Sequence, residues 1–112
     1  MIKVIKYINE KNIIVGFKCS GHADYAEEGQ DIICSAVSSL VINTVNSIEE
    51  YTSDSFDFKE DEEFGLIDFV IHSATSNESE LLLKSLFLGL QGILDAYGEQ
   101  YISINKKKIR WF

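Results

Sequence analysis

Cys34 and His22 are the two side chains of this 112-residue sequence whose types and spacing could do covalent chemistry. The 11 residues between them give the chain room to return on itself, so the two can meet. In such a pair the imidazole takes the thiol proton, the thiolate attacks a carbonyl carbon, and the imidazolium later protonates the leaving amine. The sequence therefore predicts a cysteine nucleophile activated by a histidine.

The expected place of Cys34 at the start of a helix supports this chemistry. With Asp31 as N-cap, Cys34 is the third helical residue, and its sulfur lies beside unpaired backbone N–H groups and the positive end of the helix dipole. That position favours a thiolate, and the same amides could stabilise an oxyanion. The alternative is that Cys34 is a small core residue in the apolar stripe that continues with Val37 and Val41.

Four further residues are candidates for supporting roles. Gly21 allows the backbone to come close to another segment, or to turn at positive φ, beside His22. Asp31 either caps the helix or orients the histidine through a hydrogen bond. Ser38, one turn after the cysteine, either reaches the site or bonds its own backbone. Tyr25 lies in the connecting loop, where it contacts a substrate or faces water.

A metal site is the other interpretation of the same residues. Cys19 and His22 have the Cys-x-x-His spacing of a ligand pair, and Cys34 and His72 would complete a set of four. Structural zinc sites normally combine two closely spaced pairs, and the second pair is missing here. We therefore expect no metal and no cofactor, and a surface or partly packed His72.

Periodicity predicts the elements that must position these residues. Strands 2–8 and 13–19 form a first hairpin, the loop 20–30 follows, and apolar residues at three- and four-residue steps predict helix 32–51. Strands 55–60 and 66–72 form a second hairpin. Ser76 and Asn77, with Glu80 three residues after Asn77, mark the start of a second helix through a capping box, and Gly98 ends it. A strand at 101–104, which 109–112 could extend, closes the chain. This ββαββαβ order predicts an α+β fold of two layers, with two helices on a mainly antiparallel sheet.

The second helix is apolar on more than one face. Leu81, Leu83, Leu88 and Leu90 cannot all point at one sheet. The sequence therefore predicts either a surface through which two copies associate or a helix buried deeply in a monomer.

Composition sets the remaining expectations. With 46% hydrophobic and 25% charged residues, the chain suits one domain over 1–112. Neither a secretory signal nor an apolar run of bilayer length is visible, so we expect a cytoplasmic protein and no membrane partner.

The formal charge of -8 disfavours direct nucleic-acid binding and favours a cationic partner. The acidic run 60–63 and the basic run 106–110 are expected to be solvated turns.

The stretch from Gly21 to Ser38 resembles the signature of the ribosomal-processing cysteine protease family, called Prp or YsxB-like. The residues that carry the resemblance are Gly-His-Ala at 21–23, Tyr25, Gly29, Asp-Ile-Ile-Cys at 31–34 and Ala-Val-Ser at 36–38. The combined His, Asp, Cys and Ser spacing is specific, whereas Gly-His-Ala alone would be weak. The order of strands and helices is compatible with this family over nearly all of the chain.

The resemblance implies a hydrolase of the thiol protease class that acts in ribosome biogenesis. It would be an endopeptidase that removes an N-terminal extension from bacterial ribosomal large-subunit protein twenty-seven, and it would work as a homodimer. His22 and Cys34 would be the catalytic dyad, supported by Gly21, Asp31 and Ser38. A non-catalytic, dimeric ribosome-assembly module, in which Cys34 only packs, is the alternative.

Overall fold

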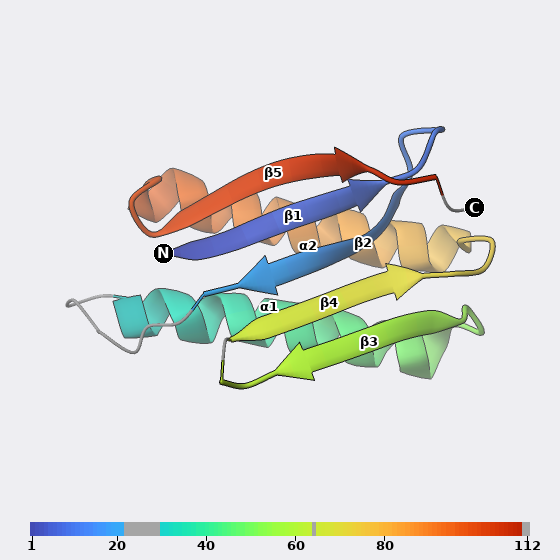
Figure 1. The fold of residues 1–112 in the computed structure, drawn as a ribbon, viewed down its shortest axis with the longest axis horizontal. Coiled ribbons are helices and arrows are strands. Elements are labelled where there is room, and N and C mark those ends of the chain that lie inside the picture. The colour runs from blue at the N-terminus through green and yellow to red at the C-terminus, as the bar shows by residue number, and fades with distance from the viewer. Residues whose placement is uncertain (22–29, 64, 111–112) are drawn as a thin grey trace.

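The computed structural model describes residues 1–21, 30–63 and 65–110, with the backbone alone at 30 and 31. These residues form five strands and two helices in the predicted order, and Figure 1 shows their arrangement. The elements are β1 (Ile2–Ile8), β2 (Ile14–Ser20), α1 (Gln30–Tyr51), β3 (Phe56–Asp61), β4 (Leu66–Ile71), α2 (Asn77–Tyr97) and β5 (Ile102–Lys108).

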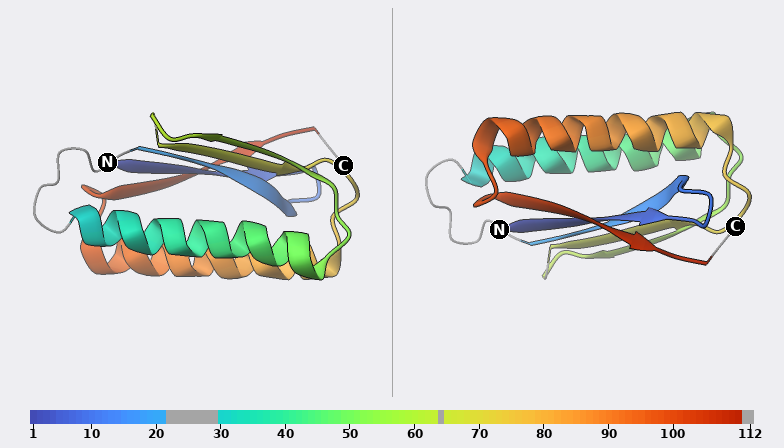
Figure 2. Two further views of the ribbon diagram at one scale, coloured as in Figure 1. Left: turned by 90° about the horizontal axis from the view of Figure 1, so that it is seen from below. Right: turned by 90° about the horizontal axis from the view of Figure 1, so that it is seen from above.

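The strands form one sheet in the order β3-β4-β2-β1-β5. Both predicted hairpins are present, β2 also pairs with β4, and all three of these pairs are antiparallel. Of the strands described here, β5 alone runs parallel to its neighbour, β1. Both helices cover the same face of the sheet, as Figure 2 shows. The predicted two-layer α+β fold with a mainly antiparallel sheet is therefore confirmed.

The core lies between the sheet and the two helices. On α1 the buried side chains follow the predicted stripe, and α2 turns a second stripe inward; the two sets are Ile33, Val37, Val41, Val45 and Ile48, and Leu83, Leu86, Phe87 and Leu90. They meet Phe17 and Phe69 of the sheet, whose rings stack at 5.4 Å between centroids. Because each helix buries an i, i+3, i+4 stripe, α1 is held along its length against the sheet.

Within α1, residues 32–51 are long and apolar enough to cross a bilayer, with a mean hydropathy of 1.4. That composition is also typical of a core helix. Here the apolar stripe of α1 packs on the sheet, from Ile33 at one end to Ile48 at the other.

The start of α2 differs from the predicted capping box. The N-cap is Ser76, whose hydroxyl accepts a hydrogen bond from the Ser79 N–H at 3.1 Å. Asp54, which follows α1, accepts bonds from both the N–H and the hydroxyl of Ser76, at 2.9 and 2.7 Å. Burial opposes ionisation of Asp54, but these bonds and one from Ser79 lower its pKa. The helix begins one residue earlier than a box at Asn77 implies because Asp54 holds Ser76 in place.

The two charged runs lie in the edge strands as well as in turns. Lys106, Lys107 and Lys108 belong to β5, and Glu60 and Asp61 end β3. Glu60 lies in the strand predicted over 55–60, and the three lysines are exposed to solvent as expected. The prediction of a turn was wrong for Asp61 and the lysines, because it ignored strand pairing beyond the local pattern. Both outer strands carry charge, which opposes edge-to-edge association.

The leucines of α2 divide between two faces. Leu83 and Leu90 are fully buried, whereas Leu81 and Leu88 are 67% and 76% exposed. Deep burial of the whole helix is therefore wrong for this chain. The exposed pair leaves an apolar strip on the outer side of the helical layer.

Candidate active site

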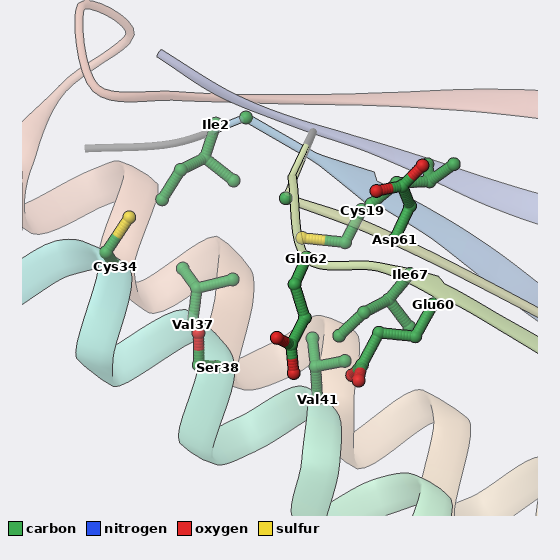
Figure 3. A pocket seen from close by; sticks show the side chains of 13 residues that line it. Ile2, Cys19, Cys34, Val37, Ser38, Val41, Glu60, Asp61, Glu62 and Ile67 are labelled. Atoms are coloured by element: carbon green, nitrogen blue, oxygen red, sulfur yellow. The ribbon is translucent and has the colours of Figure 1, made fainter. Parts of the chain in front are cut away.

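A cavity of about 240 Å³ opens where three elements end or begin. Its walls come from the end of β2, the first turns of α1 and the β3–β4 turn, which lie at one end of the sheet (Figure 1). Figure 3 shows the side chains around it. Cys34, Cys19, Ser38 and Gly21 are among the lining residues, so the cavity gathers candidates that are distant in sequence.

Cys34 stands at the boundary between the core and the cavity. Its side chain is partly buried and packs against the core cluster, yet it lines the cavity one turn before Val37 and Ser38 (Figure 3). Cys34 therefore packs against the core, as the alternative interpretation expects, but it is not sealed within it. A thiol with one side open is accessible to a peptide carbonyl.

Helix α1 begins earlier than predicted. It starts at Gln30, so Asp31 lies inside it rather than at the N-cap, and Cys34 is the fifth helical residue instead of the third. The amide of Cys34 therefore falls within the regular hydrogen-bond ladder, and the field of the helix dipole, which fades within the first turn, acts on it less strongly. The sequence pattern did not predict this extra half-turn, because Gln30 and Asp31 are polar and do not continue the apolar periodicity of the helix.

Gly21 has the conformation and the crowding that its sequence position predicts. Its φ is +119°, and a Cβ placed there would lie 2.4 Å from the Met1 carbonyl oxygen. Both properties exclude an ordinary side chain. Gly21 therefore allows the chain to pass close to Met1 at the end of β2.

Ser38 lies one turn after Cys34 and lines the same cavity, as the i, i+4 spacing predicts. His22 and Tyr25 lie outside the described residues, and so does the side chain of Asp31. The approach of His22 to Cys34, and the roles of Asp31 and Tyr25, stay predictions.

Cys19 is a second thiol in the cavity. Its side chain is 9% exposed and points from β2 toward the side on which Cys34 lies (Figure 3). Burial, followed by the negative charge of an ionised Cys34, raises the pKa of Cys19 to about 11. Cys19 is therefore a neutral thiol near pH 7 and a poor nucleophile.

The metal hypothesis finds no support in the described part of the chain. No group of three or more His, Cys, Asp or Glu side chains there is arranged to hold a metal ion. His72 follows the far end of β4, where its Nε2 lies 3.6 Å from a carboxylate oxygen of Asp57. That end of the sheet is opposite the end that carries Cys34 (Figure 1), so His72 cannot complete a site there.

The β3–β4 turn supplies cavity residues that sequence reasoning missed. Glu60, Asp61 and Glu62 line the rim, and Gly65, Leu66 and Ile67 continue the wall. The acidic run was visible in the sequence. Its place beside Cys34 depends on the β3–β4 register and on the packing of α1, neither of which is a local signal.

The two thiols should differ sharply toward iodoacetamide. We expect Cys34 to be alkylated in the folded protein near pH 7, and Cys19 to be protected until the protein unfolds. Peptide mapping by mass spectrometry, with and without denaturant, assigns the labelled residue. Equal labelling of both thiols in the folded state would contradict the difference in burial.

Known proteins resemble this chain over nearly its whole length. Residues 1–103 match the family described as cysteine protease Prp. The ribosomal processing cysteine protease Prp of Staphylococcus aureus is 34% identical over 109 residues, which cover 96% of this chain and 100% of that protein. Crystal structures of the Staphylococcus aureus protease also match. The complex with a substrate peptide gives a TM-score of 0.88 at 30% identity, and the one with a covalently linked product peptide gives 0.84 at 31%. Each match covers 96% of this chain and 100% of the other. This chain therefore belongs to the Prp family of cysteine proteases.

Proposed function

We propose that this protease is an endopeptidase that removes the N-terminal extension of bacterial ribosomal large-subunit protein twenty-seven, with Cys34 as nucleophile and His22 as general base. The observation that carries the proposal is the open side of Cys34, which lines a cavity in a chain of the Prp family. The Staphylococcus aureus relative is a ribosomal processing protease whose structures hold a substrate peptide and a covalently linked product peptide. These relatives support a peptide substrate and a covalent step.

The reaction proceeds in two stages. His22 takes the proton of Cys34, and the thiolate Sγ attacks the scissile carbonyl carbon. The C–N bond then breaks, and the leaving amine takes its proton from the His22 imidazolium, which leaves a thioester on Cys34. In the second stage, water gives a proton to His22 and attacks the thioester. The C–S bond then breaks and the His22 imidazolium returns its proton to the Cys34 sulfur, which leaves a carboxylic acid and the free thiol.

Supporting residues have distinct roles in this proposal. Gly21 directs the chain so that His22 can face the start of α1, which its positive φ and its contact with Met1 support. Asp31 orients the imidazole, Ser38 contributes a hydroxyl one turn from the nucleophile, and Tyr25 contacts the peptide.

The net charge of the protein and its family support the proposed substrate and cellular location. A formal charge of -8 suits a basic ribosomal protein and opposes direct contact with nucleic acid. We place the enzyme in the cytoplasm, where ribosomal proteins are made, and treat residues 1–112 as one domain. The exposed Leu81 and Leu88 on α2 support a homodimer. Membership of a protease family disfavours the non-catalytic binding module.

Cleavage of an intact, extended ribosomal protein tests the proposal. We expect the purified enzyme to cut it once, and intact-mass spectrometry should show the loss of the extension as a single fragment. The same protein without its extension is the matched control and should stay uncut. An extended substrate that keeps its mass through prolonged incubation would refute the proposed activity.

A further inference from the structure

Basic residues gather along one edge of the sheet. Segments 1–12 and 101–110 hold seven of the ten Lys and Arg residues of the chain, whereas of its 18 acidic residues they hold Glu10 alone. Strands β1 and β5 bring the two segments together, because they pair in parallel at the end of the strand order (Figure 1). The surface called here the basic edge consists of Lys6, Lys106, Lys107, Lys108 and Arg110.

Strand pairing concentrates these charges. Lys6 lies directly opposite Lys106 in the register of β1 and β5, and its Nζ stands 5.1 Å from the centre of the Phe87 ring on α2. Side chains alternate along a strand, so Lys108 projects on the same side as Lys106, about 7 Å from it along β5, and Lys107 projects on the other side. Because like charges opposite each other disfavour strand pairing, an anion bound here would stabilise the edge.

Protection of an edge strand does not account for the whole cluster. Lysines on β5 alone would oppose pairing with other chains. Lys6, however, lies in β1, which is paired on both sides, and Arg110 lies beyond the end of β5. Lys108 and Arg110 also line a hollow of about 460 Å³, in which Glu10 is the one described acid. The basic edge therefore includes a concave part and extends past the strand that needs protection.

The net charge of -8 does not cancel this local charge. The acidic residues of β3 and of the β3–β4 turn lie at the other end of the strand order, four strand spacings or about 19 Å away. The Debye length at physiological ionic strength is about 8 Å, so their field is largely screened at the basic edge. Most of the surface therefore disfavours nucleic acid, but this edge does not.

The chemistry of the basic edge favours RNA over a protein partner. Protein interfaces usually bury large aromatic or apolar anchors. None of the exposed large apolar side chains among the described residues belongs to β1, to β5 or to the turn between β1 and β2. Charges repeated at about 7 Å along a strand suit a polymer of phosphates better than a single phosphate. The choice of RNA rests on the proposed function, because a protease that processes a ribosomal protein works beside ribosomal RNA.

We infer that the basic edge is a docking surface for an RNA strand, which it holds by the phosphate backbone. The three lysines of β5 each contact a phosphate, and the Arg110 guanidinium can hold one with two hydrogen bonds. Ile2 lines the cavity beside Cys34, whereas Lys108 pairs with Ile8, six residues or about 20 Å along β1. A docked RNA therefore leaves the cavity open to a peptide.

Titration of a fluorescein-labelled, 20-nucleotide oligouridine with the wild-type protein tests the docking surface by fluorescence anisotropy. Four phosphate contacts predict a slope of about -3 when the logarithm of the association constant is plotted against that of the salt concentration. In the variant Lys106→Gln/Lys107→Gln/Lys108→Gln, binding at low salt should weaken by about tenfold or more, and the slope should fall to about -1.

The matched control removes the same charge elsewhere. Lys18→Gln/Lys59→Gln/Lys84→Gln changes the three lysines that lie outside segments 1–12 and 101–110. Both triple variants have the same net charge, so a difference between them depends on where the lysines lie. The control should bind the RNA within about twofold of wild type. Far-UV circular dichroism checks that both variants are folded, and both should cleave the free ribosomal substrate at the wild-type rate.

The possible results also distinguish the partner. The inference is wrong if the wild-type protein does not bind the RNA, or if the basic-edge variant binds it as tightly as the control variant does. A 20-residue polyglutamate is titrated as a second probe, and RNA should bind at least as tightly. Tighter binding of the peptide would indicate an acidic protein partner and would overturn the inference.

Cleavage of the extended ribosomal protein, measured in parallel without RNA, separates this inference from the proposed function. Cleavage by a wild-type protein that does not bind RNA overturns the docking surface and leaves the protease function standing. RNA binding that depends on the three β5 lysines, in a protein that does not cleave, supports the docking surface and counts against the function.

Discussion

Cys34→Ala and His22→Ala should each reduce cleavage of an extended ribosomal substrate by about 10⁴-fold or more. The first change removes the only described thiol that is both accessible and placed in the cavity, since Cys19 is buried and keeps its proton. The second removes the base that the proposed mechanism needs to generate the thiolate and to protonate the leaving amine. Initial rates at saturating and limiting substrate give kcat and kcat/KM for each variant.

The two substitutions should also be non-additive. Because thiol and imidazole act as one unit, the Cys34→Ala/His22→Ala double variant should be no slower than either single variant. His72→Ala is the matched histidine control, because His72 lies at the opposite end of the sheet, and it should cut at the wild-type rate. Retained cleavage in either single variant would refute the assigned dyad.

The variants should stay folded, so that a loss of activity can be attributed to the loss of a catalytic group. Cys34 is only partly buried, and losing its sulfur removes little apolar contact. A thermal unfolding midpoint within a few degrees of wild type is expected for Cys34→Ala. A collapse of stability would show instead that the packing role of Cys34 outweighs its place in the cavity.

Most of the fold was predictable because its signals are local. The stripe from Ile33 to Ile48 and the β-branched, partly alternating run of β1 each depend on a few neighbouring residues. The parallel pairing of β5 with β1 joins the two ends of the chain, and nothing within residues 102–108 encodes it. The lysines of that strand were therefore assigned to a turn.

The part of the site that depends on spacing along the chain was predictable. Ser38 shares the cavity with Cys34 because i, i+4 spacing places both on one helix face. The acidic rim escaped prediction because Glu60 and Glu62 reach the cavity only through the β3–β4 pairing and the position of α1 on the sheet. Sequence spacing thus placed Cys34 and Ser38 on one face of α1, whereas tertiary packing brought the β3–β4 turn beside them.

Gly21→Ala should lower both stability and activity, and it tests whether the exit from β2 positions the histidine. The new Cβ would lie 2.4 Å from the Met1 carbonyl oxygen at a φ of +119°, so either β1 or the backbone at residue 21 must move. Strain of this kind costs about 1–3 kcal/mol, before any loss of contacts.

The matched control for this substitution is Gly92→Ala in α2. Apart from its chain neighbours and the nearby backbone of its own helix, no described atom lies within 4 Å of a Cβ placed at Gly92, and alanine is favoured over glycine in a helix by about 1 kcal/mol. Gly92→Ala should therefore be as stable as wild type or more so, and fully active.

For Gly21→Ala we expect urea unfolding to show a loss of about 2 kcal/mol or more. We also expect kcat/KM to fall by about 100-fold, even at temperatures where the variant is folded, because a 1 Å displacement of a catalytic group has an effect of that size. If the Gly21 variant lost stability but kept the wild-type kcat/KM, the turn at Gly21 would serve only the fold, and the geometry that brings His22 to Cys34 would have to come from the chain that follows it.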